Sequence, residues 1–326
     1  MPEIISQPAR SRRQLTTSTE SYVETLVRQF CLNADLSTYD PYDVWKTRLG
    51  FGIKKLYNRH TALGALPASL FYGLDLLNHE RRLFYRKTDY PIVRAFAILC
   101  LLDLYRRKPE EALIESALVH ARWLLARSCY GYKGLCWGLG FRHAVSRHIN
   151  YDANTPFSTI TPYVLEALLA LSQFSEVVDI ESVVEGVFRF FDCDLAIMYQ
   201  DSEALATSYG PLQDRTVINA VSYAMYSYAL CLPFLTGTQR LHAENRIRQL
   251  YAFIRRHQQP NGSWFYSIDP SSFIDCFHSC IILKNIIKTT DILILSGSNA
   301  LVASGYRYIY DSLFDRYLLR FPKRFA

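Results

Sequence analysis

The sequence predicts an all-α protein that folds as a single domain. Apolar residues recur at three- and four-residue spacing in about ten segments, which is the pattern of amphipathic helices. No segment shows the alternation of apolar and polar residues that marks a half-buried strand. Helix pairs recur roughly every 50–60 residues, and loops rich in aromatic and polar side chains precede alternate helices. These features predict paired helices whose loops gather functional side chains at one end.

The predicted helices have recognisable starts and stops. The first keeps its apolar spacing from Tyr22 to Phe30, and the polar segment 1–19 before it is expected to be disordered. Pro109 precedes the second helix of a hairpin, where proline is tolerated. The helical domain is expected to span 20–326, with helices at 20–33, 67–77, 92–107, 110–127, 161–174, 180–196, 220–235, 243–257, 273–287 and 298–319.

Composition and charge limit the classes of partner. Half of the 326 residues are apolar and 20% are charged, which is typical of a protein with a large core. The 36 basic and 30 acidic residues give a net charge of +6, which is compatible with an anionic substrate or with peripheral contact with a membrane surface. We expect no nucleic-acid partner and no membrane-spanning segment, because no apolar stretch reaches the necessary length.

The eight cysteines are scattered and show no disulfide-scaffold spacing, which favours a reducing compartment. The N-terminal segment lacks the apolar stretch of an export signal, so we expect a cytoplasmic protein. Cys276 and Cys280 lie four residues apart on a predicted helix, and His278 points away from them. We interpret both as core thiols and expect neither a metal site nor a cofactor.

The most informative stretch lies between the helices predicted at 243–257 and 273–287. It contains the turn-forming sequence Pro260-Asn261-Gly262, followed by Ser263-Trp264-Phe265-Tyr266. Asp275 and His278 lie three residues apart at the start of the next helix, so their side chains share one face. An imidazole titrates near neutral pH, which predicts that His278 is an acid/base held by Asp275 or by a carboxylate from 40–43.

This stretch resembles the last signature of the VpsJ-like polysaccharide biosynthesis proteins. These are α/α toroids related to six-hairpin glycosidases and terpenoid cyclases, and they are found in bacterial exopolysaccharide and lipopolysaccharide gene clusters. The turn Gln258-x-x-x-Gly262-x-Trp264 is also similar to a repeat of terpene cyclases, which are α/α toroids too. The resemblance covers roughly residues 36 to 290 and implies a toroid with one central cleft and a role in polysaccharide biosynthesis.

Other segments carry the same resemblance. Tyr39-Asp40-Pro41-Tyr42-Asp43 matches a family segment in full, and Thr207–Pro211 and 217–220 resemble its Ser-Tyr-x-Pro and Val-x-Asn-Ala segments. The chain departs from the family pattern at two places. Val93 stands near a usual Asn position, and Phe157 stands where the family has Asn after Thr-Pro. The second departure removes one amide from the implied site.

The candidate site residues come from these segments. The candidates for catalysis are His278, Asp275, Asp40, Asp43 and Tyr209. The candidates for substrate binding are Tyr42, Arg94, Trp137, Asn219, Trp264 and Tyr266, with Trp264 and Tyr266 stacking on a sugar ring. Each has an alternative local role as a cap, turn or helix-seam residue, and a helix cap with an Asx-turn is the favoured interpretation of Asp40 and Asp43.

Three functions are compatible with these residues. The first is an enzyme that modifies a glycan, one containing uronic acid included, by epimerisation, elimination or hydrolysis. The second is a non-catalytic glycan-binding or scaffold subunit of polysaccharide assembly, which the departures at Val93 and Phe157 favour. The third is a terpene- or prenyl-handling enzyme, against which the chain lacks an Asp-x-Asp-Asp motif. The partner expected for the first two is an oligosaccharide or polysaccharide intermediate.

Overall fold

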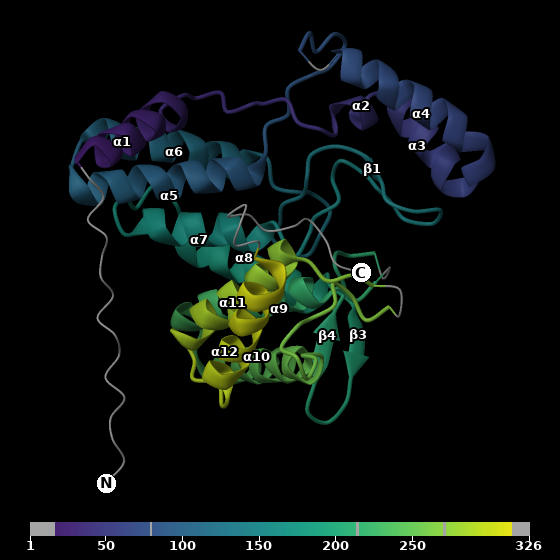
Figure 1. Ribbon diagram of the computed structural model, residues 1–326. Helices are drawn as coiled ribbons and strands as arrows, with labels where there is room; N and C mark the ends of the chain where they lie inside the picture. Colours follow the sequence, from purple (N-terminus) through teal and green to yellow (C-terminus); the bar gives the residue numbers. More distant parts are fainter. Residues whose placement is uncertain (1–16, 79, 213–214, 270–271, 315–326) are drawn as a thin grey trace.

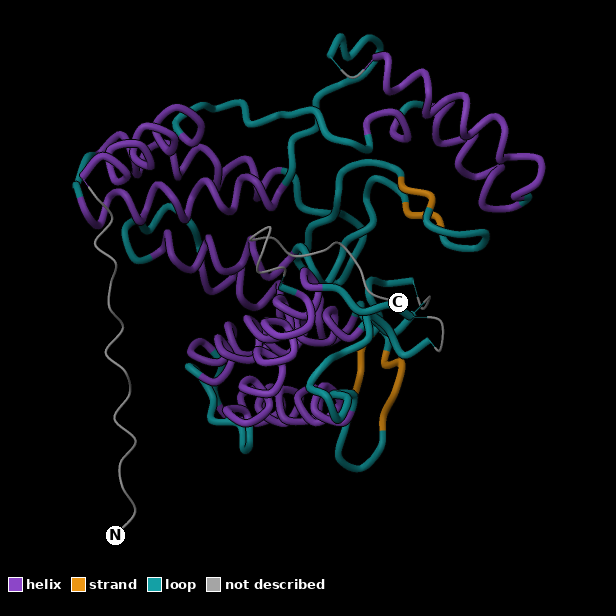
Figure 2. Tube along the Cα trace, in the orientation of Figure 1, coloured by secondary structure: helices purple, strands orange, loops and turns teal. Residues whose placement is uncertain are grey.

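The computed structural model of the protein describes residues 17–78, 80–212, 215–269 and 272–314, and these residues form an α/α toroid (Figures 1 and 2). Neighbouring helices of a first layer pack against one another in chain order. The helices of a second layer alternate with them along the chain and pack on the first layer. The fold class expected from the sequence is therefore confirmed.

The first layer consists of α1 (Thr17–Cys31), α5 (Pro91–Arg107), α7 (Thr161–Ser172), α9 (Ile218–Cys231) and α11 (Cys276–Thr290). The second consists of α6 (Glu111–Ala126), α8 (Ile180–Cys193), α10 (Gly237–Arg256) and α12 (Ser298–Tyr308). A 3-10 turn at Leu232–Phe234 follows α9, and a π-helical turn at Ile309–Leu313 follows α12. The loops that enter the first-layer helices carry most of the site described below.

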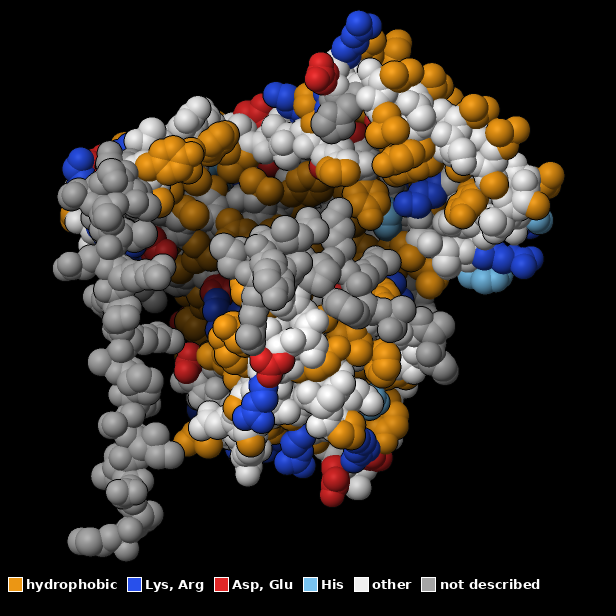
Figure 3. Space-filling model, viewed as in Figure 1, with side chains coloured by type: hydrophobic (Ala, Val, Ile, Leu, Met, Phe, Trp, Pro, Cys, Tyr) orange, Lys and Arg blue, Asp and Glu red, His pale blue; other side chains and the backbone are white. Residues whose placement is uncertain are grey.

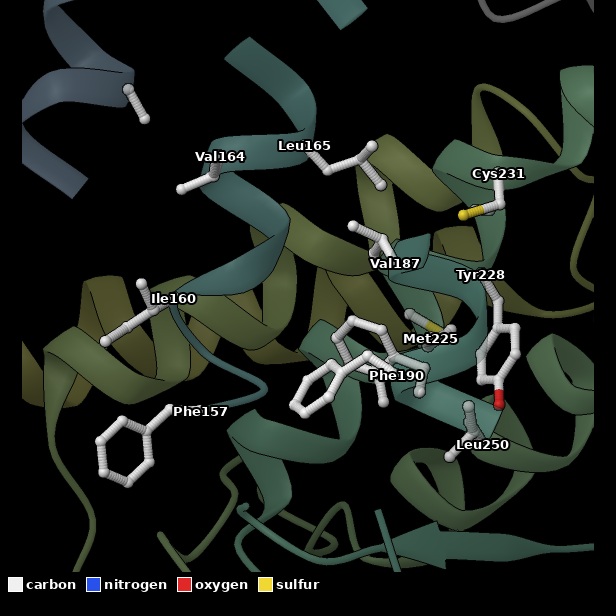
Figure 4. Close-up of a cluster of buried hydrophobic side chains, with 14 of the residues drawn as sticks. Phe157, Ile160, Val164, Leu165, Val187, Phe190, Met225, Tyr228, Cys231 and Leu250 are labelled. Atoms are coloured by element: carbon white, nitrogen blue, oxygen red, sulfur yellow. The ribbon is translucent and has the colours of Figure 1, made fainter. Parts of the chain in front are cut away.

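The centre of the core lies around α9, which is buried over 13 of its 14 residues. A helix buried on nearly all sides requires other elements around it, and α7, α8, α10 and α11 surround α9. Figure 4 shows the inward side chains, with Val164, Phe190, Met225 and Leu250 contributed by four different helices. Complete burial of each such side chain is worth about 1.5–3 kcal/mol.

A helical hairpin stands apart from these two layers (Figure 1). It follows the short α2 (Asp43–Lys46) and consists of α3 (Arg48–Arg59) and α4 (Thr61–Asn78). We define the arm as residues 48–87, which include α3, α4 and the loop that follows. The two helices pack so closely at Gly64 that a Cβ atom there would lie 2.2 Å from Tyr57 Cα. Among the described elements, α4 packs mainly on α3.

Two small antiparallel sheets complete the described part of the chain. β1 (His143–Ala144) pairs with β2 (Asn150–Tyr151), which places His143 opposite Tyr151. β3 (Ile197–Gln200) pairs with β4 (Leu205–Thr207). Strands of two to four residues are too short to show an alternating pattern in the sequence, so none of them was predicted.

Most predicted helices lie within a few residues of the observed ones. The prediction at 67–77 falls inside the longer α4, and α3 was missed. Residues 17–19 begin α1, whereas disorder was expected there; residues 1–16 lie outside the described residues. The helix predicted at 298–319 divides into α12 and the π-helical turn, and its end also lies outside the described residues.

Candidate active site

A cavity of about 450 Å³ lies where the loops that precede the first-layer helices converge. Four predicted site residues line it: Tyr42, Tyr209, Tyr266 and His278. Five loop regions contribute residues to its wall: 39–43, 86–94, 130–156, 207–219 and 258–278. The other lining residues are Ile92, Leu139, His143, Val145, Tyr151, Phe157, Thr159, Ile160, Arg215 and Phe273.

Asp275 and His278 form a hydrogen-bonded pair at the start of α11. Asp275 is the N-cap of this helix: one carboxylate oxygen accepts the backbone N–H of His278 at 2.7 Å, and the other lies 2.7 Å from His278 Nδ1. The Asp275 side chain is 6% exposed, against 24% for His278. An ionised carboxylate accepts hydrogen bonds only, so Nδ1 carries the proton and Nε2 is left as the basic nitrogen of the neutral ring.

Aromatic rings surround this histidine. The Tyr266 ring lies edge-on to His278 with 4.5 Å between the centroids, and it stacks on Phe273 at 4.9 Å. On a neighbouring wall, the Phe157 ring lies 5.3 Å from Tyr209 and 4.8 Å from Tyr151. Aromatic faces combined with phenolic hydroxyls suit the apolar faces and the hydroxyl groups of a sugar ring.

Arg215 adds a positive charge to the cavity. Its guanidinium lies 4.7 Å from the centroid of the Tyr209 ring and 5.9 Å from that of Tyr266. No aspartate or glutamate is among the described residues that line the cavity. A guanidinium can bind a carboxylate in a bidentate manner, so Arg215 is a candidate group for binding a carboxylate in the cavity.

His143 on β1 provides a second imidazole. Its ring lies edge-on to Tyr42 with 5.5 Å between the centroids. Burial, together with the nearby charges of Lys54 and Arg215, lowers the pKa of His143 to about 4. His143 is therefore neutral at neutral pH and offers one N–H donor and one acceptor nitrogen.

We expect His143 to make the stability of the protein depend on pH. Its pKa is lower in the folded state than the value of about 6.5 of an unfolded chain, so the unfolded state takes up more protons in acid. Stability is therefore lost as the pH falls from about 6.5 towards about 4. Across this pH range, thermal unfolding should show a smaller loss of stability in His143→Gln than in the wild type. Equal losses in the two proteins would contradict this account.

Asp40 and Asp43 do not line the cavity. Asp40 accepts the backbone N–H of Tyr42 at 2.6 Å in an Asx-turn, and Asp43 accepts that of Asp40 at 2.8 Å. Both carboxylates pair with Lys46, whose Nζ also lies 3.0 Å from Thr88 Oγ1. These contacts hold the turn that presents Tyr42, which is the structural role that the residues alone favoured. The catalytic roles predicted for Asp40 and Asp43 have no support in this arrangement.

The two tryptophans predicted to bind substrate belong to the core instead. The Trp137 indole N–H donates to the carbonyl of Leu124 at 2.7 Å, and that of Trp264 donates to the carbonyl of Ile254 at 3.0 Å. Both side chains are fully buried. Stacking of Trp264 on a sugar ring has no support in this arrangement, because of the predicted stacking pair only Tyr266 lines the cavity.

Trp264 should accordingly affect stability far more than ligand binding. A Cβ atom on Gly305 would lie 2.5 Å from the Trp264 ring, so the site is tightly packed. We expect Trp264→Ala to lower the free energy of unfolding by about 3–5 kcal/mol, measured by urea denaturation. The milder Trp264→Phe should fold and keep its ligand affinity, whereas Tyr266→Leu should lose affinity. The reverse order of affinities would restore the role predicted from the sequence.

Arg94 is not among the residues that line the cavity either. It is 2% exposed, pairs with Asp89, lies 2.9 Å from His120 Nδ1 and covers the Trp123 ring at 4.7 Å. His120 Nε2 in turn lies 2.8 Å from the carbonyl oxygen of Cys31, and burial lowers the pKa of this histidine. Arg94 thus joins α1, α5 and α6, and this arrangement gives no support to its predicted substrate contact.

Asn219 lies near the start of α9 and is 4% exposed. Its side-chain oxygen is buried and accepts no hydrogen bond from the described residues. It is not among the residues that line the cavity, so its predicted contact with substrate is not supported by this arrangement. A buried amide of this kind needs a hydrogen-bond partner.

His143 and Arg215 were missed as site residues. His143 lies in the loop region 130–156 and Arg215 in the loop region 207–219, but neither belongs to a motif of the resembled family. Among the described residues, no group of three His, Cys, Asp or Glu side chains is placed to hold a metal ion. Cys280 is exposed, so the interpretation of both α11 cysteines as core thiols holds only for Cys276.

A second hollow, of about 630 Å³, lies between the start of α5 and the end of α6. Its lining includes Asp89, Trp123, Arg127 and Asn154. It is larger than the cavity at His278 but contains no hydrogen-bonded acid/base pair among its lining residues. The size of a hollow does not identify a catalytic site, and we place the candidate site at His278.

No protein-family model matches the chain, and no curated protein matches it in sequence. Several solved structures share its fold. An unsaturated glucuronyl hydrolase from Bacillus sp. GL1 is 13% identical, covers 87% of this chain and 78% of its own, and gives a TM-score of 0.53. A sugar epimerase from a ruminal bacterium is 12% identical, with coverages of 87% and 79% and a TM-score of 0.55. A cellobiose 2-epimerase from Spirochaeta thermophila is 14% identical, with coverages of 96% and 90% and a TM-score of 0.54. At these identities the similarity shows the fold alone.

Proposed function

We propose that the protein is a carbohydrate-modifying enzyme that removes a carbon-bound proton from a sugar residue of an oligosaccharide. The observation that carries the proposal is the His278–Asp275 pair on the wall of an aromatic cavity. Its fold is shared with a sugar epimerase, a cellobiose 2-epimerase and an unsaturated glucuronyl hydrolase, which supports a saccharide as the substrate.

The proposed reaction begins at His278 Nε2. This nitrogen takes a proton from a sugar carbon next to a carboxylate or carbonyl group, and the C–H bonding electrons pass into that group. Asp275 stabilises the imidazolium that forms and keeps the ring in one orientation. Arg215 binds the substrate carboxylate, where negative charge accumulates. Return of a proton to the other face of the carbon gives the epimer, and the Tyr209 hydroxyl is the candidate donor.

Elimination begins with the same proton removal and ends with loss of the group on the neighbouring carbon. Hydrolysis by a pair of carboxylates requires two acidic side chains that flank the scissile bond. The described cavity-lining residues include no carboxylate, and Asp275 lies behind His278. Epimerisation or elimination is therefore favoured over hydrolysis of this type.

The biological setting is part of the proposal. The segments Tyr39–Asp43, Thr207–Pro211 and 258–278 support membership of the VpsJ-like proteins and a place in exopolysaccharide or lipopolysaccharide biosynthesis. All eight cysteines are free thiols, which supports the reducing cytoplasm as the location. Contact with a membrane surface is also proposed, and the arm that would make it is treated below.

Mass spectrometry of saccharides incubated with the protein in D₂O tests the proposed proton removal. Uronate-containing oligosaccharides should gain one deuterium per turnover by epimerisation, or should divide into a saturated and an unsaturated product by elimination. Neutral oligosaccharides of the same length serve as matched controls for the role of Arg215. Binding without deuterium uptake or cleavage would overturn the enzymatic proposal in favour of a glycan-binding subunit. Addition of water without deuterium at carbon would indicate hydrolysis.

A further inference from the structure

The arm carries a continuous apolar stripe on α4. Leu63, Leu66, Leu70, Leu74 and Leu77 recur at three- and four-residue spacing, and each side chain is between 61% and 81% exposed. The only charged residue in α4 is Asp75. Figure 3 shows hydrophobic side chains along the outer edge of the arm. An exposed apolar stripe of this length marks a surface that binds a partner or a membrane.

The arm also carries a concentration of positive charge. Residues 48–87 contain eight basic and two acidic residues, a net charge of +6 that equals the net charge of the whole chain. Six of the eight cations are exposed: Arg48, Lys55, Arg59, Arg81, Arg86 and Lys87. The rest of the protein is thus neutral on balance, and the excess charge lies on the segment that carries the leucine stripe.

The loop after α4 adds an exposed aromatic ring. Phe84 is 94% exposed and adopts a positive φ of 67°, and Leu83 beside it is 52% exposed. Non-glycine residues with positive φ are uncommon, and a bulky one there is held in a strained conformation. Phenylalanine and leucine side chains are typical of the apolar faces of surface-bound elements, which enter the boundary between lipid headgroups and acyl chains.

We propose that the arm is a membrane-docking element that binds the surface of an anionic lipid bilayer. The leucine stripe of α4 and Phe84 enter the boundary between headgroups and acyl chains, and the exposed lysines and arginines of the arm attract the anionic headgroups. No described helix is long and apolar enough to cross the bilayer, so the arm lies on the surface.

The positive charge of the arm, together with its leucine stripe, favours an anionic bilayer over two other partners, a second copy of the chain and a nucleic acid. A second copy of the chain packed on the same stripe would bring two surfaces of +6 together, which opposes association. A nucleic acid would match the charge but would leave the leucine stripe without an apolar partner. An anionic bilayer satisfies both features at once.

The arm also joins the candidate active site. Lys54 on α3 lies over the Tyr42 ring at 5.2 Å, and α3 packs against β1, which carries His143. Both Tyr42 and His143 line the cavity. Docking would hold this wall of the cavity beside the bilayer, where a saccharide attached to a lipid is presented. The docking itself is independent of the reaction proposed above.

Vesicle flotation with the full chain tests the proposal. The chain should float with vesicles of phosphatidylcholine and phosphatidylglycerol and remain free with phosphatidylcholine alone. Leu66→Gln with Leu70→Gln should lower the partition at least tenfold. Lys55→Gln and Arg59→Gln should each lower it about fivefold, and added salt should have the same effect.

Leu241→Gln is the matched control, because Leu241 is 67% exposed on α10, away from the arm. It should bind vesicles as the wild type does. An equal loss of vesicle binding in Leu241→Gln would overturn the proposal, and so would a wild-type chain that does not bind anionic vesicles. A dimer detected by sedimentation that the double variant Leu66→Gln with Leu70→Gln dissociates would also overturn it. Binding of the chain to nucleic acid that persists in this double variant would do the same. Deuterium uptake by a soluble saccharide is expected to be unchanged in the arm variants, so failure of docking and failure of the reaction are distinguishable.

Discussion

Replacement of His278 by Gln is expected to lower the rate of proton removal about 10²–10⁴-fold, the contribution typical of a positioned acid/base group. Glutamine retains hydrogen-bonding groups but has no basic nitrogen. The Asp275 carboxylate continues to cap α11 through the backbone N–H at residue 278, so the fold should persist. Initial rates of deuterium uptake, with circular dichroism as the check on folding, measure the effect.

Two further variants sharpen this prediction. In Asp275→Asn the amide oxygen still caps α11, but the amide N–H group donates to His278 Nδ1 and favours the tautomer with Nε2 protonated. The rate of proton removal should fall, and the free energy of unfolding should change little. His242→Gln is the matched control, because His242 Nε2 lies 2.6 Å from Asp192 in a similar pair outside the cavity. Its rate should equal that of the wild type. A fully active His278→Gln would contradict the role of the imidazole.

Replacement of Lys46 by Met is expected to destabilise the fold by about 3–5 kcal/mol. Lys46 is the cation shared by Asp40 and Asp43, and the Asp43 side chain is 1% exposed. Removal of the cation leaves a buried carboxylate without its charge partner, which costs more than the loss of the pair as a whole. The free energy of unfolding from urea denaturation measures the change.

The matched control combines Lys46→Met with Asp40→Asn and Asp43→Asn. The amide oxygens keep the two turn hydrogen bonds to the backbone N–H groups of Asp40 and Tyr42, while the buried charges are removed. Much of the lost stability should return in this triple variant. A Lys46→Met protein within about 1 kcal/mol of the wild type would show that the cluster is solvated and does not hold the turn.

The sequence predicted the helices whose apolar residues recur with a strong helical period. It missed α3, whose composition is unfavourable for a helix. α3 contains Gly50 and Gly52, which have low helix propensity, and so it gave a weak signal. The structure explains Gly50, because a Cβ atom there would lie 1.9 Å from the carbonyl oxygen of Val44. Requirements of this kind arise from contacts between elements and are invisible in the sequence of one element.

The candidate site was predictable in its location more than in its members. The loops before the first-layer helices converge as the fold requires, which brings Tyr42, Tyr209, Tyr266 and His278 together. The direction of each side chain was not predictable. Trp264 lies two residues before Tyr266, yet its ring packs in the core while Tyr266 lines the cavity. A motif places a segment, whereas packing decides which of its side chains is available to a ligand.

A structure of the protein with a bound uronate-containing oligosaccharide tests the central claim most directly. We predict a sugar ring against Tyr266 in the 450 Å³ cavity, with its carboxylate at Arg215. The carbon next to that carboxylate should lie about 3–3.5 Å from His278 Nε2, the distance of a reactive arrangement. A saccharide bound in the hollow beside Trp123 and Arg127 would contradict the account. A sugar in the cavity whose hydroxyl groups alone contact His278 would contradict it equally.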